Sequence, residues 1–212
     1  YSAKQTMFIA QSLYEGVELG DEGQVGLITY MRTDSLNLAD KFLEESGGYI
    51  KEKFGDKYYP GSPTSYKTKS KGAQEAHEAI RPTFPEKSPE DIKEYLDPKQ
   101  FKLYELIWRR AMASQMAPAK LASTTIDVAA DKYVLRATGS TIDFDGYLKL
   151  YADSQKEQFL PAVTKGDALD LKKLNPQQKF TNPPARYSEA ALVKKLEELG
   201  IGRPSTYAPI IS

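Results

Sequence analysis

Apolar residues recur at helical spacing in two long stretches of the first half of the chain. In residues 3–17, "AKQTMFIAQSLYEGV", they lie three and four positions apart, which is the pattern of an amphipathic helix. Residues 98–116, "PKQFKLYELIWRRAMASQM", repeat this pattern. In the second stretch, four large side chains would lie on one face of the helix: Phe101, Tyr104, Ile107 and Trp108. The pattern predicts a helix-rich domain over residues 1–117.

Near residue 117 the pattern changes to short β-like runs separated by Gly, Asp and Asn. Such runs with turn residues between them are typical of antiparallel sheets. The runs are "TTIDVAA", "KYVLRATG", "GYLKLYA" and "DALDLKKL". We therefore predict a β-strand arm over residues 118–182, with open sheet edges that invite pairing with another strand.

The helical period returns after the arm, in residues 183–212. Ser188 is placed to cap the start of a helix and Gly200 to end it. The apolar stripe of this helix is Leu192, Leu196 and Leu199. A second helix is predicted from Pro204, because proline suits the first position of a helix. The whole chain is thus predicted as an α+β fold: a helical domain, an antiparallel arm, and the start of a second helical domain.

Composition limits the function more than it identifies it. The chain has 212 residues, of which 40% are hydrophobic, enough to build a core. Lys plus Arg and Asp plus Glu each number 29, so any binding of nucleic acid must use a local patch. We expect a cytoplasmic protein, since no run approaches the roughly 18 apolar residues of a membrane span and no signal peptide is visible. The start without Met and the end inside a helical pattern indicate a segment of a larger protein.

Metal and disulfide chemistry are restricted by residue type. The sequence has no cysteine and a single histidine, His77. Disulfides and thiolate metal sites are therefore excluded, and an imidazole cage for a metal has too few ligands. We predict no metal site in this chain.

The first candidate for chemistry is "GLITYMRTDS", residues 26–35. If residues 28–32 are extended, Tyr30 and Arg32 project to the same side. A phenol of pKa about 10 needs a nearby positive charge to act as a nucleophile at neutral pH, and Arg32 could supply it. Asp34 and Ser35 are placed to cap a following helix, whose N-terminus would favour an anion. The pattern indicates a phosphodiester substrate, although the same spacing also occurs in ordinary cores and ion pairs.

Two further motifs carry clustered polar groups. "AQEAHEAIRPT", residues 73–83, predicts a helix stopped by Pro82, with His77 and Arg81 one turn apart on a common face. The two side chains could then reach one phosphate, or they could belong to a solvated face balanced by neighbouring glutamates. "GIGRPSTYAPI", residues 200–210, contains a tight turn before a helix start. The turn gathers three polar side chains that suit a phosphate or an ordinary helix corner: Arg203, Ser205 and Thr206.

Together these motifs resemble those of the type IA DNA topoisomerases. The strings are "GLITYMRTDS", "AHEAIRPT" and "PPARYSEAALVKKLEELGIGRPSTYA", in this order and spacing, and the Met between Tyr30 and Arg32 resembles the bacterial topoisomerase I branch. The resemblance covers essentially the whole chain. It implies that Tyr30 attacks a DNA phosphodiester, forms a 5′-phosphotyrosine intermediate, and lets another strand pass before the break is resealed without ATP.

The resemblance also implies roles for other residues. Arg32 would hold the scissile phosphate, and His77 would lie in or beside the catalytic site. The residues expected to bind DNA are Arg81, Arg186, Arg203, Ser205 and Thr206. The implied partners are single-stranded DNA and negatively supercoiled duplex DNA in the bacterial nucleoid, with a monomeric enzyme and no membrane. Mg²⁺ would be bound in the parent enzyme by a Toprim domain, expected before Tyr1, so this chain alone is expected to be inactive.

Other classes of protein fit less well. Tyrosine recombinases gather several Arg and His residues, and rolling-circle nucleases use a His-rich metal site, whereas this sequence has one histidine. A single-stranded DNA-binding module without chemistry remains an alternative, with aromatic rings stacking on bases and cations contacting phosphates. A protein-interaction domain is the least specific alternative.

Overall fold

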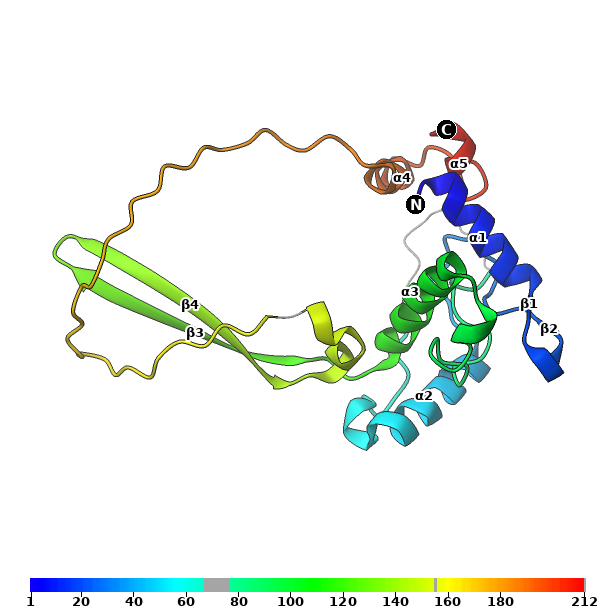
Figure 1. The fold of residues 1–212 in the computed structure, drawn as a ribbon, viewed down its shortest axis with the longest axis horizontal. Coiled ribbons are helices and arrows are strands. Elements are labelled where there is room, and N and C mark those ends of the chain that lie inside the picture. Colours follow the sequence, from blue (N-terminus) through cyan, green and yellow to red (C-terminus); the bar gives the residue numbers. More distant parts are fainter. Residues whose placement is uncertain (67–76, 155, 212) are drawn as a thin grey trace.

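The computed structural model describes residues 1–66, 77–154 and 156–211. It has a helical body, a long two-stranded hairpin that projects from the body, and an extended segment that returns from the hairpin to two C-terminal helices (Figure 1). The structure combines helices with antiparallel strands, and its long hairpin stands apart from the helices, so the predicted α+β class is confirmed. The last helix of the body ends at Gln115, close to residue 117, where the sequence pattern changes.

Three helices form the body, and two of them begin with a capping box. Helix α1, Ala3–Glu15, starts after Ser2, whose hydroxyl accepts a hydrogen bond from the Gln5 amide. Helix α3, Pro98–Gln115, starts after Asp97, whose carboxylate accepts from two backbone amides. Such caps satisfy amides that have no partner inside the helix. Both helices were predicted, and both are confirmed.

The remaining helix of the body, α2 (Asp40–Phe54), starts later than the sequence indicates. Its N-cap position is Ala39, which has no side-chain oxygen to cap the helix. Asp34 and Ser35 were predicted as capping residues, and that prediction is wrong. The Ser35 hydroxyl instead accepts a hydrogen bond from the Asn37 amide at 3.1 Å, which stabilises a local turn before the helix.

The core of the body lies between the three helices and the segment before α2. The predicted stripe on α3 points into it: Tyr104 is fully buried and Trp108 is 4% exposed, and Phe101 and Ile107 pack against its edge. The polar end of the buried Tyr104 side chain has a partner, because its hydroxyl donates to the Lys87 carbonyl. Other large members of the core are Leu13, Leu27, Phe42, Ile50 and Met112. A small hairpin of β1 (Val17–Glu18) and β2 (Gln24–Val25) follows α1.

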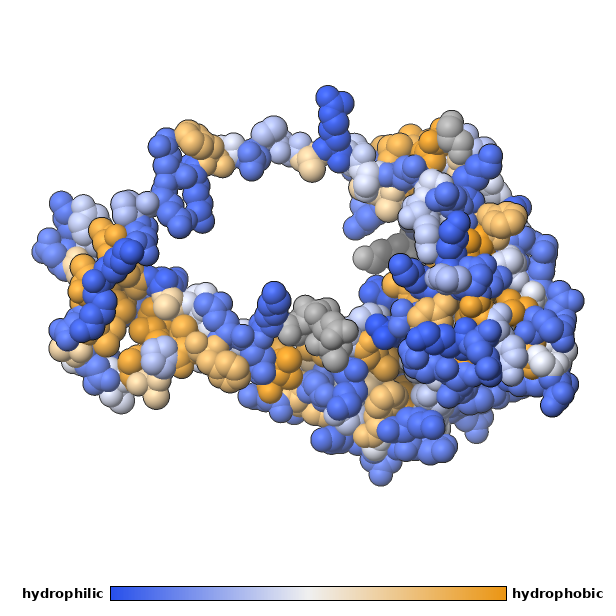
Figure 2. Space-filling view, viewed as in Figure 1, coloured by the Kyte–Doolittle hydropathy of each residue, from blue (hydrophilic) through white to orange (hydrophobic). Residues whose placement is uncertain are grey.

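Strands β3 (Lys120–Ala130) and β4 (Tyr133–Phe144) form the projecting hairpin. They pair antiparallel along their whole length, with Ile126 opposite Ala137. Both faces are open to solvent: Val134 is 65% exposed and Leu135 is 50% exposed, and apolar side chains are visible along the hairpin in Figure 2. The two runs predicted as the first strands of the arm are confirmed.

The prediction of strands for the other two runs is wrong. Residues 146–152 belong to a kinked 3₁₀ helix, Gly146–Ser154, which packs Leu148 into a buried position at the base of the hairpin. Residues 167–174 form no helix or strand and are exposed. Alternating apolar residues favour a strand only where a neighbouring strand can pair with it, and this extended segment has no such neighbour along residues 167–174 among the described residues.

Two short helices complete the chain beside α1 (Figure 1). Helix α4, Glu189–Glu198, has Ser188 as its N-cap, as predicted. The predicted role of Gly200 is also confirmed: it has a φ of +70° and lies just past the helix, where its amide donates to the Glu197 carbonyl. Helix α5, Tyr207–Ile210, begins three residues later than predicted, because Pro204 and the next two residues form a turn.

The hairpin, the returning segment and the body enclose an open hole, which Figure 2 shows in space-filling form. The Ala3 amide donates to a Glu189 carboxylate oxygen at 2.7 Å, and this bond joins the start of α1 to the start of α4. The C-terminal helices therefore contact the body, and the chain closes into a ring.

Candidate active site

The backbone before Tyr30 is held on two sides by distant parts of the chain. On one side, the Leu27 amide donates to the Leu13 carbonyl in the last turn of α1, at 2.8 Å. On the other, the Thr83 amide donates to the Leu27 carbonyl at 2.9 Å, and the Thr29 amide donates to the Arg81 carbonyl at 3.0 Å. Tyr30 therefore leaves a segment that is fixed between a helix end and a second extended segment.

The side chain of Thr29 strengthens this second attachment. Its hydroxyl donates to the Ala79 carbonyl at 2.7 Å and accepts from the Arg81 amide at 3.0 Å. These bonds, with an isolated bridge between Ile28 and Pro82, keep residues 77–83 extended. The predicted helix over residues 73–83 is therefore wrong for residues 77–83, and residues 73–76 lie outside the described part of the chain.

The Tyr30 side chain is partly open to solvent, with 37% of its surface exposed. Its ring lies between two other aromatic rings. The Tyr14 ring centre is 5.4 Å away at an interplanar angle of 66°, and the His77 ring centre is 6.0 Å away at 68°. Edge contacts of this kind are favourable for aromatic pairs. The structure thus brings Tyr30 and His77 together, as predicted, although not through a helix.

Arg32 follows Tyr30 by two positions and is exposed, as Tyr30 is. Met31, between them, is only 5% exposed. The condition set for a shared side, that residues 28–32 are extended throughout, is not met, because the chain bends at residues 31 and 32. Within the described part of the chain, the exposed Arg32 guanidinium forms no ion pair with a carboxylate within 4.0 Å.

Arg81 points into the protein. Its side chain is 11% exposed, and its Nε donates to Glu78 Oε2 at 2.7 Å. One terminal nitrogen donates to the Pro82 carbonyl at 2.9 Å, and the guanidinium lies over the Phe42 ring, 4.7 Å from its centre. The predicted arrangement of His77 and Arg81 on one helical face is therefore wrong. The hydrogen bonds of the Arg81 side chain stabilise residues 78–82, the segment to which the backbone before Tyr30 is bonded.

The other predicted DNA-binding residues lie in the C-terminal region. Arg186 is exposed in the extended segment before α4. Arg203 is exposed between α4 and α5, and one of its terminal nitrogens donates to the Gly202 carbonyl. The Thr206 hydroxyl accepts from the Arg203 amide at 2.9 Å, so Thr206 orders the turn. Ser205, also exposed, lies in the same turn.

A hollow of about 410 Å³ lies between this C-terminal region and the segment that follows Tyr30. Three groups of residues line it: the start of α1, residues 31–34 apart from Arg32, and α4 with α5. Tyr207 is in its wall, and the pKa of its phenol is raised by burial and by the negative charges of Glu197 and Asp34. The turn that carries Arg203 and the segment that carries Arg32 therefore meet across one hollow.

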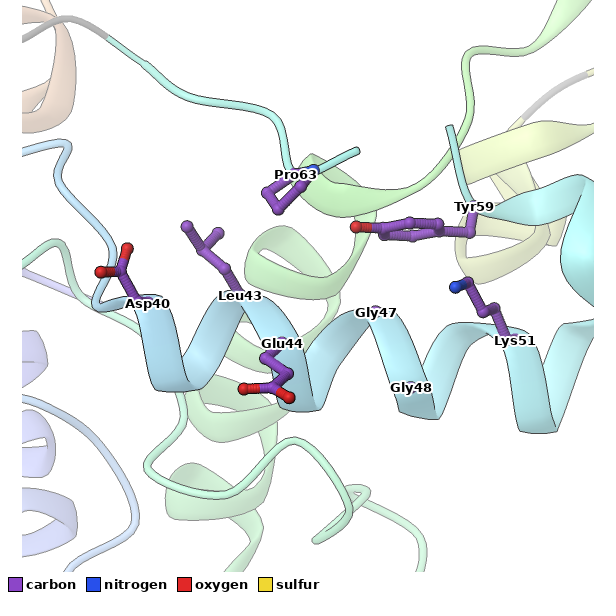
Figure 3. Close-up of a pocket in the computed structure, with 8 residues that line it drawn as sticks. All are labelled: Asp40, Leu43, Glu44, Gly47, Gly48, Lys51, Tyr59 and Pro63. Atoms are coloured by element: carbon purple, nitrogen blue, oxygen red, sulfur yellow. The ribbon is translucent and has the colours of Figure 1, made fainter. Parts of the chain in front are cut away.

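A second hollow, of about 330 Å³, runs along α2 and is lined by none of the predicted site residues. Figure 3 shows Tyr59 over Gly47 of the helix, and Pro63 over Leu43. A Cβ at position 47 would lie 3.0 Å from the Tyr59 ring, so glycine allows this close packing. The Lys51 ammonium lies 4.7 Å from the centre of the same ring. We assign no chemistry to this hollow.

Among the described residues, no group of three or more His, Asp or Glu side chains could hold a metal ion. In the same residues, no helix has the length and apolar character needed to cross a bilayer.

Tyr14 and Thr29 are the site residues that sequence reasoning missed. In the sequence, Tyr14 is one more aromatic residue of an amphipathic helix, and Thr29 is one more β-branched residue of an apolar run. Both depend on contacts with distant segments, and the local pattern gives no signal of such contacts.

Comparison with known proteins agrees with this arrangement. A sequence model described as DNA topoisomerase matches residues 1–212. The DNA topoisomerase 1 of Rickettsia bellii is 52% identical over 220 residues, which cover 100% of this chain and 27% of that protein. The DNA topoisomerase 1 of Campylobacter jejuni is 51% identical over 212 residues, which cover 100% of this chain and 30% of that protein.

A solved structure shares the fold. Full-length topoisomerase I from Thermotoga maritima aligns with a TM-score of 0.82 at 39% identity, over 100% of this chain and 34% of that chain. The present chain spans about three tenths of the length of the curated relatives named above. Because the family match covers every residue and the fold agrees with a solved relative, the chain belongs to the type IA DNA topoisomerases.

Proposed function

We propose that this chain carries the nucleophile of a DNA strand-cleaving and strand-rejoining enzyme, and that the nucleophile is Tyr30. The observation that supports it is the combination of a partly exposed phenol with a backbone anchored on both sides. A nucleophile must reach a phosphorus atom in a large substrate, so its hydroxyl has to be accessible and its position fixed. Tyr30 has both properties.

The proposed reaction is a transesterification. The Tyr30 oxygen forms a bond to the phosphorus of a DNA phosphodiester, and the bond from phosphorus to the 3′ oxygen breaks. The phenol gives up its proton, and the departing 3′ oxygen gains one, so charge and atoms balance. One phosphoester bond replaces another, which is why rejoining by the reverse step needs no ATP. Passage of another strand through the break would relax negative supercoils.

Arg32 and His77 are proposed to assist this step. Negative charge builds on the phosphate oxygens as the new bond forms, and a guanidinium stabilises such charge through its planar set of donors. Arg32 is exposed beside Tyr30, where a phosphate can reach it. The His77 ring touches the Tyr30 ring at its edge, so it lies next to any phosphate that the phenol attacks.

The DNA strand is proposed to extend from Tyr30 toward the C-terminal helices. Arg186 and Arg203 supply exposed cations for phosphates, and Ser205 and Thr206 supply hydroxyl groups in an ordered turn. The contacts between α1 and α4 place this turn on the side of the body that carries residues 31–34. The buried contacts of Arg81 favour a structural role for that residue.

Further parts of the proposal concern the protein beyond this chain. Mg²⁺ is proposed as the metal of the reaction, with ligands outside residues 1–212, because the described residues offer no suitable ligand group. The full enzyme is proposed to act as a monomer in the bacterial nucleoid. The 212-residue chain with Mg²⁺ should leave a negatively supercoiled plasmid unchanged on an agarose gel, and relaxation by the purified chain would contradict this part.

Replacement of Tyr30 by Phe in the full-length enzyme tests the nucleophile directly. Tyr30→Phe removes only the hydroxyl, so covalent protein–DNA adducts on a denaturing gel should disappear while binding of a single-stranded oligonucleotide stays within about twofold. Tyr95→Phe is the matched control, because Tyr95 has a similar exposed fraction of 40%. An adduct that persists in Tyr30→Phe would assign the attack to another tyrosine. Binding by the wild-type enzyme with no adduct at all would favour the alternative, a single-stranded DNA-binding module.

A further inference from the structure

Tyr14 is the aromatic neighbour of Tyr30 that lies outside all the motifs used so far. Its ring meets the Tyr30 ring edge to face with centres 5.4 Å apart, at 66°. Its side chain is 41% exposed, so it does not belong to the core. An exposed aromatic ring beside a proposed nucleophile needs an explanation other than burial.

The Tyr30 ring contacts the His77 ring as well as the Tyr14 ring. His77 meets it with centres 6.0 Å apart at 68°, and His77 comes from the extended segment, whereas Tyr14 comes from α1. Rotation of the Tyr30 side chain about its Cα–Cβ bond would break both ring contacts. The two neighbours therefore favour one direction of the phenol oxygen.

The position of Tyr14 is coupled to the Tyr30 segment through the backbone as well. The Leu27 amide donates to the Leu13 carbonyl at 2.8 Å. A Cβ at Gly26 would lie only 2.9 Å from the Tyr14 carbonyl oxygen, which is closer than real Cβ contacts allow. The glycine lets the last turn of α1 approach the segment, and this approach brings the two rings together.

From this geometry we propose that Tyr14 is a positioning residue, whose ring holds the Tyr30 phenol in the orientation used for attack. The proposal rests on the proposed function of Tyr30. It assigns the effect to the Tyr14 ring, because an edge-to-face contact needs the aromatic face and edge only. The Tyr14 hydroxyl has no part in it.

The test compares three variants of the full-length enzyme in single-turnover cleavage of an oligonucleotide. Tyr14→Leu keeps a good helix former but removes the ring, and we expect cleavage to slow about two- to tenfold, the range of an aromatic pair. The oligonucleotide dissociation constant should stay within about twofold. Tyr14→Phe should keep most of the rate. Phe8→Leu is the control on the same helix, since Phe8 is 77% exposed, and it should cleave like wild type.

A second measurement on the 212-residue chain does not depend on cleavage. In NMR spectra of the chain with selectively labelled tyrosine and histidine, the Tyr30 ring signals should shift in Tyr14→Leu, as should the His77 ring signals, while Tyr14→Phe should change them little. Unchanged Tyr30 signals and an unchanged cleavage rate in Tyr14→Leu would overturn the proposal. Equal loss of rate in Tyr14→Phe and Tyr14→Leu would overturn it too, because the hydroxyl would then be the active group.

These outcomes are separate from failure of the proposed function. If Tyr30→Phe still forms an adduct, Tyr30 is not the nucleophile, whatever the Tyr14 variants do. If Tyr30→Phe forms none and Tyr14→Leu cleaves at the wild-type rate, Tyr30 remains the nucleophile and only the positioning role is refuted.

Discussion

Replacement of Arg81 by Ala should destabilise the helical body and thereby distinguish a structural arginine from a DNA contact. The change removes a hydrogen bond to the Pro82 carbonyl at 2.9 Å, an ion pair with Glu78, and the stacking of the guanidinium on Phe42. It also leaves a partly buried acceptor without its donor. The extended segment that holds Thr29 would lose the side chain that packs it against α2.

The size of the effect can be estimated from these contacts. A hydrogen bond from a charged donor contributes about 1.5–3 kcal/mol, and a cation over an aromatic ring about 0.5–2 kcal/mol. The pair with Glu78 adds about 0.2–1 kcal/mol, because the Glu78 side chain is 35% exposed and solvent screens the charges. Since neighbouring contacts are not additive, we expect a loss of roughly 2–4 kcal/mol in the free energy of unfolding.

Thermal unfolding of the 212-residue chain, followed by circular dichroism, measures this loss. At about 2–4 °C per kcal/mol for a chain of this size, Tm should fall by roughly 4–16 °C. Arg81→Lys should be intermediate, because it keeps the charge but lacks the planar fork. Arg203→Ala is the control, since Arg203 is exposed, and its Tm should change little. An Arg81→Ala protein that melts like wild type but binds single-stranded DNA several-fold more weakly would refute the structural assignment.

Three further changes test other contacts. Asp145→Asn should weaken stability more at neutral pH than in acid. Burial raises the pKa of Asp145, yet the hydrogen bond from Tyr58 and the charge of Lys149 lower it overall, so its contribution is present above about pH 4 and is lost progressively as pH falls further. The difference in Tm between variant and wild type should therefore be smaller at pH 3 than at pH 7, and an equal difference at both pH values would contradict this. Gly146→Ala should cost more than about 1 kcal/mol in urea unfolding, because Gly146 has a φ of +50° and a Cβ would lie 2.5 Å from the Ala117 carbonyl oxygen; Gly48→Ala, with free space around it, should be neutral or stabilising. Gly26→Ala should slow cleavage by the full-length enzyme as well as lower Tm, since its Cβ would push against the Tyr14 carbonyl, and an unchanged cleavage rate would show that the α1 contact does not orient Tyr30.

The parts of the fold that the sequence predicts well are those in which local patterns and tertiary packing agree. Helices α1 and α3 have both an apolar stripe and a capping box, so each signal supports the other. The hairpin of β3 and β4 is similar, because its two strands are adjacent in sequence and pair with each other. In residues 146–152, apolar and polar side chains alternate as they do in a strand. These residues nevertheless fold as a 3₁₀ helix at the base of the hairpin, where Leu148 is buried.

The sequence patterns singled out Tyr30, Arg32 and His77 but did not predict how they are held. Tyr30 and Arg32 are both exposed, with Met31 buried between them, although the chain bends at residues 31 and 32 instead of continuing as a strand. The pairing of His77 with Arg81 failed because the decisive contacts are long-range: the Thr29 hydroxyl binds carbonyl and amide groups about fifty positions further along the chain. No local periodicity encodes a hydrogen bond of that kind.

The segment that carries Tyr30 has little regular secondary structure of its own, and this has a consequence for catalysis. A side chain on a helix or strand is positioned by the repeating hydrogen bonds of that element. Tyr30 is positioned instead by bonds of Leu27 to α1 and to Thr83, and by the bonds of Thr29 to residues 79–81. Substitutions of those distant partners should therefore change the cleavage rate even though the partners do not contact DNA. The size of the rate change should follow the loss of order of the Tyr30 side chain more closely than the loss of positive charge near the phosphate.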